Sequence, residues 1–393
     1  MKKSLRLLCC MLALLLAACG KSSDHSPTAS TCMSDDATDY EAYCSSMFAE
    51  TAEGYYYAYE TSIGDERISL IYFCPRGGDT FQPLCGKPNC LHTDEDCNAW
   101  FNGYITYYDG SLYTLDEDGL SVIKMNLDGT DHQIIAKMDI SAFSNKGFTY
   151  RLFPGKFFVL LLPDDGISKE YQHLLYLDLS DNTQKELVSE ESAASLLCGM
   201  IACHHDKVFL EAFDGEGCFS FNDQRLLEMN LQTGETRTVT TGYFDGLYVT
   251  DSTVYYFEPD EKEVEKNYGT TYKNVDTPGF REYDCKSGIT RNCGMPWEDM
   301  LAIQSDPDYI YVGGYTRKDN SFLLYILSRD YALVDQISLS RDLCPTFVSS
   351  DRLYFCTDMG LGPIGYYLDK SEIGSHKLSL KPIQTLLPEA AAD

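Results

Sequence analysis

One motif recurs seven times along this chain of 393 residues and limits what it can fold into. Each copy begins with a turn that contains Gly, Asp or Ser, and continues into an aromatic residue flanked by apolar ones. After most of these come a second apolar run and a third. Successive copies are 43 to 57 residues apart. The seven aromatic positions, called the anchors below, are Tyr56, Tyr113, Phe158, Phe209, Tyr255, Tyr311 and Tyr354.

Residues 104–138 show the motif most clearly. Three short apolar runs are separated by turn signals in this stretch. Asp109-Gly110, Asp118-Gly119 and Asp128-Gly129 stand where hairpin turns need residues that tolerate positive φ. The stretch therefore predicts one antiparallel meander.

Repeats of this length, built from short aromatic-rich strands, are typical of propeller blades. A single four-stranded blade cannot bury both of its faces, but a closed ring of blades buries both and leaves no long open edge. The 29 Tyr and 19 Phe suit strands and flat faces between blades, and no long stretch has helical periodicity. We predict an all-β fold, a β-propeller of seven blades, at residues 41–388, with a C-terminal tail at 389–393. Six or eight blades are the alternatives, because the first and last units could merge or the N-terminal strand could complete the ring.

The segment from Asp109 to Thr130 resembles one blade of the YWTD-type propellers of low-density-lipoprotein-receptor relatives, with Tyr107-Tyr108-Asp109 in place of the YWTD string. It is more similar to a set of uncharacterised cell-surface lipoproteins of gut Firmicutes that share this repeat. One blade matches well, and the others match in spacing. The resemblance implies a fold and no substrate, because propellers carry many unrelated functions.

The first 18 residues have the pattern of a lipoprotein signal peptide. Three basic residues precede an apolar run that ends at Ala18 and is too short to span a bilayer core of about 30 Å. Leu16-Ala17-Ala18-Cys19 matches the bacterial lipobox, so we predict cleavage before Cys19 and attachment of a diacylglyceryl group to its thiol. An ordinary secretory signal is the alternative. Residues 19–40 are small and polar, which predicts a flexible tether on the extracytoplasmic face of the cell membrane.

The chain is strongly acidic. Its formal net charge is −29, and it becomes −32 when the three basic residues of the signal peptide are removed (−29 − 3). Such a surface repels nucleic acid and anionic lipid heads, and no cluster of Lys and Arg offsets the repulsion. We predict no nucleic-acid partner.

Cysteine is abundant. Of the sixteen cysteines, thirteen remain when Cys9, Cys10 and the lipidated Cys19 are set aside (16 − 3). An odd number leaves at least one free thiol or metal-bound sulfur. Several lie in predicted strands, where a small buried thiol and a disulfide are both open alternatives. These are Cys74, Cys203, Cys218, Cys285 and Cys356.

The densest group of metal-binding residue types spans residues 85–97. Three thiols and an imidazole within thirteen residues suit a tetrahedral zinc, although C-x4-C-x-H-x4-C is not one of the common zinc spacings. The element resembles a CGKPNC-type element of the same Firmicute lipoproteins. One alternative is a disulfide within the loop, with the third cysteine joined to Cys74 or Cys44. Another is free thiols, with the imidazole capping a turn. The four candidate ligands are Cys85, Cys90, His92 and Cys97.

The other polar groups contain no catalytic constellation. His204-His205 is predicted to be a solvated turn, with a metal pair as the alternative because Cys203 adjoins it. Acidic runs such as 116–118, 164–165 and 260–265 could hold calcium or serve a glycosidase, but solvated acidic turns are the favoured interpretation. No G-x-S-x-G elbow, H-E-x-x-H or Gly-rich phosphate loop occurs at a strand-to-helix junction.

The longest departure from the repeat is residues 258–280. Its charge and length predict a projecting loop that contacts a partner through Glu258, Asp260, Tyr268 and Tyr272. We predict a membrane-anchored binding or scaffold lipoprotein for a protein, peptide or glycan, rather than an enzyme. The alternatives are an exported propeller enzyme, such as a glycan- or peptide-processing hydrolase or lyase, and an envelope assembly or sensory partner.

Overall fold

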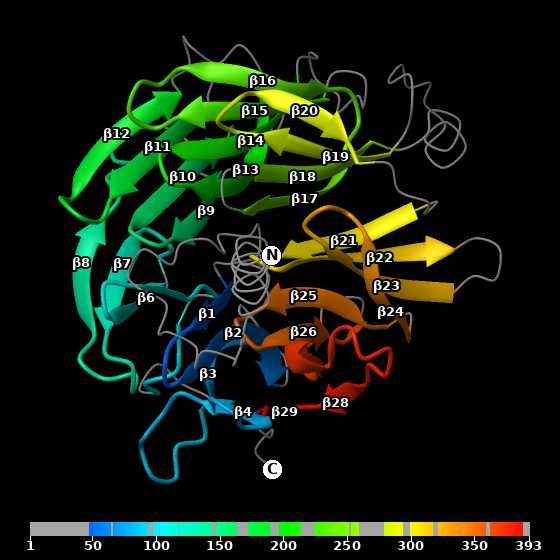
Figure 1. Ribbon diagram of the computed structural model, residues 1–393. Coiled ribbons are helices and arrows are strands. Elements are labelled where there is room, and N and C mark those ends of the chain that lie inside the picture. Colours follow the sequence, from blue (N-terminus) through cyan, green and yellow to red (C-terminus); the bar gives the residue numbers. More distant parts are fainter. Residues whose placement is uncertain are drawn as a thin grey trace, which may run out of the picture. The chain divides into compact units, whose positions relative to one another are not determined.

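The computed structural model describes residues 47–387, apart from 64–65, 93–96, 102, 117, 144–146, 163–171, 189–195, 214–223, 251–252, 259–278, 294–298, 317–320, 341 and 359–361. The described residues form seven small sheets in a ring, which is a seven-bladed β-propeller (Figure 1). The predicted all-β class and the predicted number of blades are confirmed. The predicted signal peptide, Cys19 and the tether lie outside the described residues.

Each blade takes four strands in chain order. Blade 1 contains β1 (Phe48–Glu50), β2 (Gly54–Ile63), β3 (Glu66–Pro75) and β4 (Thr80–Pro83). Blades 2 and 3 contain β5 (Thr106–Tyr108), β6 (Ser111–Leu115), β7 (Ser121–Met125) and β8 (Gln133–Lys137), then β9 (Gly147–Phe153), β10 (Lys156–Leu162), β11 (His173–Asp178) and β12 (Thr183–Val188). Blades 4 and 5 contain β13 (Leu196–His204), β14 (Lys207–Phe213), β15 (Gln224–Asn230) and β16 (Thr236–Thr241), then β17 (Asp245–Thr250), β18 (Thr253–Glu258), β19 (Gly279–Asp284) and β20 (Ile289–Asn292). Blades 6 and 7 contain β21 (Asp299–Ser305), β22 (Tyr309–Thr316), β23 (Ser321–Ser328) and β24 (Leu333–Leu339), then β25 (Cys344–Val348), β26 (Arg352–Cys356), β27 (Ile364–Asp369) and β28 (Leu380–Pro382).

Helix contributes little to the described residues. The 3-10 helix η5 (Lys370–Glu372) is a single turn, and the carboxylate of Asp369 caps it by accepting from the Ser371 amide. None of the helices in the described part of the chain is long and apolar enough to cross a membrane.

All seven anchors lie in the second strand of their blade, and all seven are buried. The second strand is covered on both faces by the neighbouring blades and on both edges by the first and third strands. A large aromatic residue there removes the most apolar surface from water. The anchors therefore mark the centre of each blade.

Strand β10 shows why the central strands are apolar without interruption. Successive side chains of a strand point to opposite faces of its sheet. Phe157, Val159 and Leu161 accordingly join the apolar cluster between blades 2 and 3. Phe158 and Leu160 join the cluster between blades 3 and 4. Because both faces are covered, both sets of positions must be apolar.

Six such clusters fill the seven seams between blades. Five of them each join two neighbouring blades. The largest joins three, because it includes Phe347 of blade 7, Tyr57 of blade 1 and Leu112 of blade 2. Buried apolar side chains therefore fill the seam at which the ring closes, in addition to the polar contacts there.

The propeller has two different ends. Neighbouring strands of a blade are antiparallel, so the turns after the first and third strands lie at one end, called the turn face. The connections after the second strand and the links between blades lie at the opposite end, called the loop face. Strand β18 ends at Glu258 on the loop face, and β19 begins there at Gly279.

The meander predicted at residues 104–138 is confirmed as blade 2. Asp109 and Gly110 join β5 to β6 with φ of 45° and 74°, as a tight hairpin turn requires. Gly129, with φ of 75°, has a second constraint, because a Cβ atom there would lie 2.9 Å from the carbonyl oxygen of Leu84 in blade 1. Both the positive φ and the close approach of blade 1 thus favour glycine in the turns of this blade.

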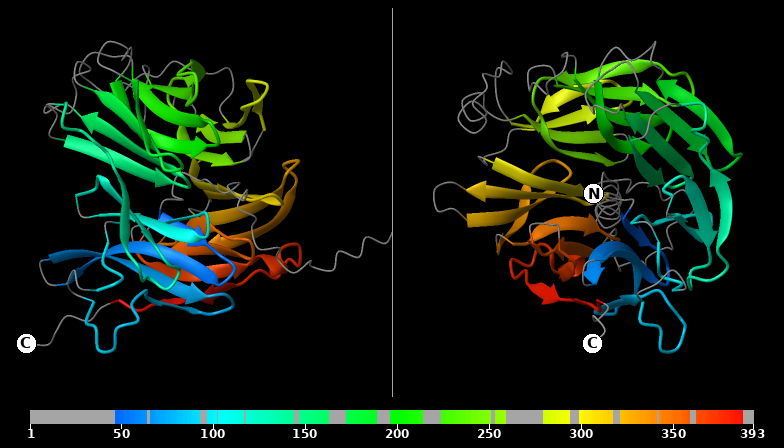
Figure 2. Two further views of the ribbon diagram at one scale, coloured as in Figure 1. Left: turned by 90° about the vertical axis from the view of Figure 1, so that its left-hand side faces the viewer. Right: turned by 180° about the vertical axis from the view of Figure 1, so that it is seen from behind.

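The C-terminal strand closes the ring. Strand β29 (Gln384–Thr385) pairs in parallel with β4, with Gln384 opposite Thr80 and Thr385 opposite Phe81. The Leu386 amide donates to the Phe81 carbonyl at 2.9 Å. The ring is therefore completed by the C-terminal strand on the outer edge of blade 1. The alternatives, in which the first and last units merge or the N-terminal strand completes the ring, are not found. Figure 2 shows the blue strands of blade 1 beside the orange and red strands of blade 7.

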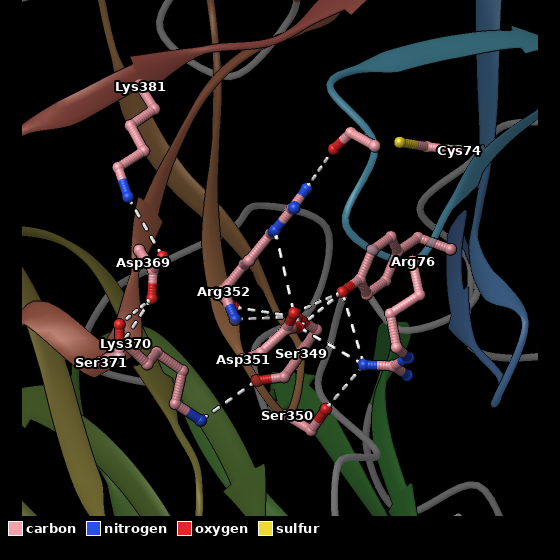
Figure 3. A network of polar contacts seen from close by, with 12 residues as sticks. Cys74, Arg76, Ser349, Ser350, Asp351, Arg352, Asp369, Lys370, Ser371 and Lys381 are labelled. Carbon is pink, nitrogen blue, oxygen red and sulfur yellow. Dashed lines mark hydrogen bonds and ion pairs between the residues drawn. The ribbon is translucent and has the colours of Figure 1, made fainter. Parts of the chain in front are cut away.

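A polar network covers the same seam on the turn face (Figure 3). Arg76 donates to Glu50 at 2.7 Å and to the Ser350 hydroxyl at 3.2 Å, so its guanidinium joins blades 1 and 7. Arg352 of blade 7 donates to the Gly78 carbonyl of blade 1 at 2.7 Å. Lys370 extends the polar contacts to blade 6, where it lies 2.6 Å from the buried carboxylate of Asp306. Charged groups in this region are thus paired across blades.

Candidate metal centre

The outer edge of blade 1 is interrupted. The Leu84 amide, next to β4, donates to the Ile71 carbonyl of β3 at 2.8 Å. The chain then leaves the sheet and returns at Ala99, whose carbonyl accepts from the Ile71 amide at 2.8 Å. Trp100 forms an antiparallel bridge with Leu70, so the returning segment continues the pairing that β4 began. Residues 85–98, called the excursion below, thus leave and rejoin β3 at one residue, Ile71.

The four predicted metal ligands come together in this excursion. Each of Cys85, Cys90, His92 and Cys97 offers one ligand atom, and these four atoms all lie within 4.8 Å of one another. The Nδ1 atom of His92 is 3.2 Å from the Cys97 sulfur. Within the described residues, this is the one place where three or more metal-binding side chains converge.

Local backbone geometry explains the convergence. The Cys85 amide donates to the Pro83 carbonyl at 2.7 Å, which bends the chain as it leaves the sheet. Asn89 and His92 have φ of 60° and 59°, a left-handed conformation that reverses the direction of the chain. Asn and His adopt this conformation more readily than most residues. The turn brings Cys90 and His92 back towards Cys85.

The four groups differ in burial. Cys97 is buried in the core cluster of blade 1, and Cys85 and Cys90 are partly buried against that cluster. The Ala99 amide lies 3.4 Å from the Cys97 sulfur and donates to it. Cys97 therefore connects the group of four ligands to the apolar interior of the propeller.

Burial and neighbouring groups shift the protonation equilibria of three of the ligands. Burial lowers the pKa of His92, which favours the neutral imidazole that can bind a metal. Burial raises the pKa of Cys97 to about 12, aided by the nearby thiols. Burial also acts to raise the pKa of Cys85, but hydrogen bonds from the Lys87 and Asn98 backbone and from the other thiols outweigh it and lower the pKa. The Cys85 thiol therefore loses its proton more readily than an ordinary cysteine.

The thiols of Cys74, Cys85, Cys90 and Cys97 are free in the structure. The disulfide alternative is therefore not formed among these four cysteines, and Cys44 lies outside the described residues. Three of the cysteines predicted to lie in strands are buried there: Cys74, Cys203 and Cys356. Cys285 is also buried, but it lies in the turn that follows β19, and Cys218 lies outside the described residues.

Two predictions about other polar residues are wrong. His204 is not part of a solvated turn: it ends β13 and is buried, and its ring packs edge-on against that of exposed His205 at a centroid distance of 4.1 Å. Glu258 is not an exposed partner-loop residue: it is buried at the end of β18, 2.6 Å from the Arg281 guanidinium. Asp260, Tyr268 and Tyr272 lie outside the described residues.

The acidic run at 116–118 is accounted for by turn capping where it is described. The Asp118 carboxylate accepts from the Leu120 and Ser121 amides at 2.8 and 2.9 Å and pairs with Lys137 at 2.7 Å. These contacts favour a capped turn over a calcium site. Residues 164–165 and 260–265 lie outside the described residues.

Sequence reasoning missed the residues that close the ring. Glu50, Arg76 and Asp351 look like ordinary turn residues, and their partners across the seam lie 274 to 300 residues away. The C-terminal β29 is two residues long and has no turn that links it to β4. No local signal in the sequence could have revealed either contact.

The ring of seven sheets places the chain in the class of seven-bladed β-propellers. No protein-family model matches the chain, and no curated protein matches it in sequence. A solved puromycin hydrolase resembles it with a TM-score of 0.53 and 10% identity, over 91% of this chain and 56% of that one. A prolyl endopeptidase gives a TM-score of 0.51 and 11% identity, over 90% of this chain and 52% of that one.

A third neighbour has a different coverage. An oligogalacturonate lyase from Vibrio parahaemolyticus gives a TM-score of 0.52 and 13% identity, over 86% of this chain and 93% of the lyase. This chain therefore spans about half the length of the hydrolase and the endopeptidase but nearly all of the lyase. At these identities the likeness establishes the propeller fold.

Proposed function

We propose that the chain is a membrane-anchored lipoprotein whose propeller binds a protein, peptide or glycan at its loop face. The lipobox at Cys19 and the polar residues 19–40 support the anchor and the tether. The propeller then stands on the extracytoplasmic side of the membrane. The resemblance of blade 2 to the blades of YWTD-type propellers and of Firmicute lipoproteins is consistent with this location.

The unequal length of the connections carries the binding part of the proposal. On the turn face, the connections run from two residues, between β5 and β6, to ten, between β27 and β28 (111 − 108 − 1 and 380 − 369 − 1). On the loop face, β10 and β11 are separated by ten residues and β18 and β19 by twenty (173 − 162 − 1 and 279 − 258 − 1). Long connections gathered at one end of a rigid scaffold are the usual place for recognition. The residues between Glu258 and Gly279 are therefore the first place to seek a ligand contact.

The anchor is tested by Cys19→Ala in the full chain. Wild-type protein should fractionate with the membrane and carry an acyl group detectable by mass spectrometry of its N-terminal peptide. The Cys19→Ala protein should lack that group and leave the membrane fraction. Cys9→Ala and Cys10→Ala are matched controls, because both cysteines precede the cleavage site and should not affect lipidation. Unlipidated wild-type protein would refute the anchor.

Binding is tested with a panel of cell-surface glycans and peptides. The wild-type protein should retain at least one class of ligand. Replacement of residues 259–278 by a short Gly-Ser linker should abolish that binding, whereas Ile134→Ser, at an exposed position on the outer strand of blade 2, should not. Equal retention by the linker variant and the wild type would move the site away from this connection.

An exported propeller enzyme is the second candidate function. The observation that favours it is the near-complete coverage of the lyase, since a propeller of about this size forms most of that protein. An assay for unsaturated products from acidic oligosaccharides, and one for peptide cleavage, would detect such an activity. Turnover by the purified chain that persists after the Gly-Ser replacement would favour an enzyme with a site elsewhere. An envelope assembly or sensory partner remains a variant of the binding proposal.

A further inference from the structure

We infer that Cys85, Cys90, His92 and Cys97 bind one Zn²⁺ ion, and that this ion joins the two ends of the interrupted outer strand of blade 1. The first support is the convergence of the four ligand atoms within 4.8 Å. A tetrahedral ion with Zn–S bonds of about 2.3 Å separates its sulfur atoms by about 3.8 Å. Small rotations of the four side chains therefore complete the coordination.

The ligand set selects the metal. Thiolate sulfur and imidazole nitrogen are ligands that zinc prefers, whereas calcium and magnesium take oxygen. Four protein ligands fill a tetrahedral ion and leave no open position for water or substrate. The ion therefore has a structural role. Binding exchanges protons for metal: one Zn²⁺ replaces the three thiol protons, which are released to solvent, and the neutral imidazole donates a lone pair.

The position of the ligands defines what the metal stabilises. Cys85 directly follows Leu84, the last residue hydrogen-bonded to β3 before the excursion. Cys97 lies two residues before Ala99, the first to pair with β3 after it. An ion bound by both cysteines therefore holds the two ends of the excursion close to each other. It thereby keeps the two halves of the outer strand aligned on Ile71.

Ring closure lies next to this site. Strand β4 pairs with β3 on one edge and with the C-terminal β29 on the other. The apolar core of blade 1 includes Cys97 and Leu84 together with Phe347 of blade 7. Loss of the metal should therefore loosen both the segment that rejoins β3 at residues 99–101 and the closing strand β29. Zinc binding here does not depend on whether Cys19 carries a lipid.

The test begins with the metal content of the full chain, purified without chelator and without a polyhistidine tag. We expect about one zinc per chain. Replacement of the metal by Co²⁺ should give the strong sulfur-to-cobalt charge-transfer absorption and the visible bands of a tetrahedral site. A chain that neither retains zinc nor binds added Zn²⁺ or Co²⁺ stoichiometrically would overturn the inference. So would non-reducing peptide mapping that shows a disulfide between any two of the three cysteines.

Substitutions distinguish the metal ligands from a cysteine that does not bind the metal. His92→Ala should weaken zinc binding at least tenfold, and His92→Cys should restore it, because a fourth thiolate also completes a tetrahedron. Cys97→Ser should lose the metal. Cys293→Ser is the matched control, because this half-buried thiol lies beyond β20 in blade 5 and should leave the zinc content unchanged. Full zinc retention by a Cys85→Ser, Cys97→Ser double variant would refute the assignment.

Hydrogen exchange on the wild-type chain tests the structural role without any variant. Removal of zinc by a chelator should increase exchange at the Ile71 and Phe101 amides, which donate across the junction to Ala99 and Ser69. Amides within β14 of blade 4 should keep their protection, and added Zn²⁺ should reverse the change. Unchanged exchange at the junction in a chain that has lost its zinc would show that the ion does not join the strand.

Discussion

The phenol hydroxyl of Tyr55 donates to the carboxylate of Asp351, with oxygen–oxygen distances of 2.6 and 2.7 Å. The two residues belong to the first and last blades, so the contact lies across the seam at which the ring closes. The guanidinium groups of Arg76 and Arg352 lie 5.1 and 5.5 Å from the centre of the Tyr55 ring. Burial and then the Asp351 carboxylate raise the pKa of Tyr55, so the hydroxyl remains a donor throughout the neutral range.

Tyr55→Phe should weaken the closing seam. The change removes a hydrogen bond to a charged group, and we expect a loss of about 1 to 2 kcal/mol in the free energy of unfolding. Exchange of the Ser350 amide, which donates to Glu50 across the seam at 2.8 Å, should increase as well. Urea unfolding and hydrogen exchange measure the two effects.

Tyr176→Phe is the control for this prediction. The Tyr176 hydroxyl also donates to an aspartate, Asp178, at 2.9 Å, but both residues lie on β11 of blade 3. The control should lose similar stability without a change at Ser350. Equal exchange at Ser350 in the two variants would show that the Tyr55 contact does not hold the seam.

A chain that ends at Pro382 should lose the closing strand. The truncation removes the buried side chain of Ile383 and the pairing of Gln384 and Leu386 with blade 1. Burial of an isoleucine contributes about 1.5 to 3 kcal/mol and each net hydrogen bond about 1 kcal/mol. We expect a loss of about 3 to 5 kcal/mol by urea unfolding. A chain that ends at Leu387 keeps β29 and should match the full-length chain, so equal losses in both would contradict the closing role.

Arg281→Met should be among the most destabilising changes in blade 5. Its guanidinium lies 2.6 Å from Glu258, and the two side chains are only 9% and 7% exposed. Removal of one partner leaves a buried charge without its counter-charge, which costs about 3 to 5 kcal/mol. The free energy of unfolding by urea checks this value.

The double variant Arg281→Met, Glu258→Leu separates pairing from burial. Replacement of both charges by apolar groups removes the uncompensated charge, so stability should return close to that of the wild type. The Thr240 hydroxyl, which donates to Glu258 at 2.9 Å, would then lose its acceptor and limit the recovery. A double variant no more stable than Arg281→Met would show that the pair does more than neutralise charge.

His204 should make the propeller sensitive to mild acid. Burial, and then the nearby cations His205, Lys156, Lys207 and Lys286, lower the pKa of His204 from 6.5 to about 4. The unfolded chain therefore binds a proton between these values that the folded chain does not, so stability falls as the pH falls from 6.5 towards 4. The loss attributable to this group is up to about 3 kcal/mol.

His204→Phe removes the titrating group and should flatten the difference in stability between pH 6.5 and pH 4 by that amount. Thermal unfolding across the range measures it. His205→Asn is the control, because residue 205 has φ of 48°, which asparagine tolerates, and its exposed side chain should leave the dependence in place. An identical pH dependence in the His204→Phe protein would refute the assignment.

The fold could be predicted because the motif is local. A turn, an aromatic anchor and an apolar run lie within about ten residues of one another, and all seven anchors fall on second strands. Closure could not be predicted, because Gln384 pairs with Thr80 without a connecting turn. The partners Tyr55 and Asp351 are 296 residues apart, so nothing near either residue indicates the contact.

The candidate site was predictable in composition and not in placement. The four ligands lie within thirteen residues, so their types alone indicated a metal. That the chain rejoins β3 at Ile71 depends on tertiary hydrogen bonds. His204 and Glu258 were misplaced for a related reason. Polar neighbours in the sequence suggested water, whereas in a propeller the flanking blades cover such positions and a cation on the adjacent strand, Arg281, neutralises Glu258.

The pairing of β29 with β4 affects the order in which the blades are completed during synthesis. Thr80 and Gln384 are separated by 304 positions (384 − 80), so β4 is synthesised long before its parallel partner. At about 5 to 20 residues per second, the delay is roughly 15 to 60 s. During that interval the outer edge of blade 1 offers unpaired backbone groups to any other extended chain. The blade that is made first is thus the last to be finished, and its outer edge waits for its partner until the end of synthesis.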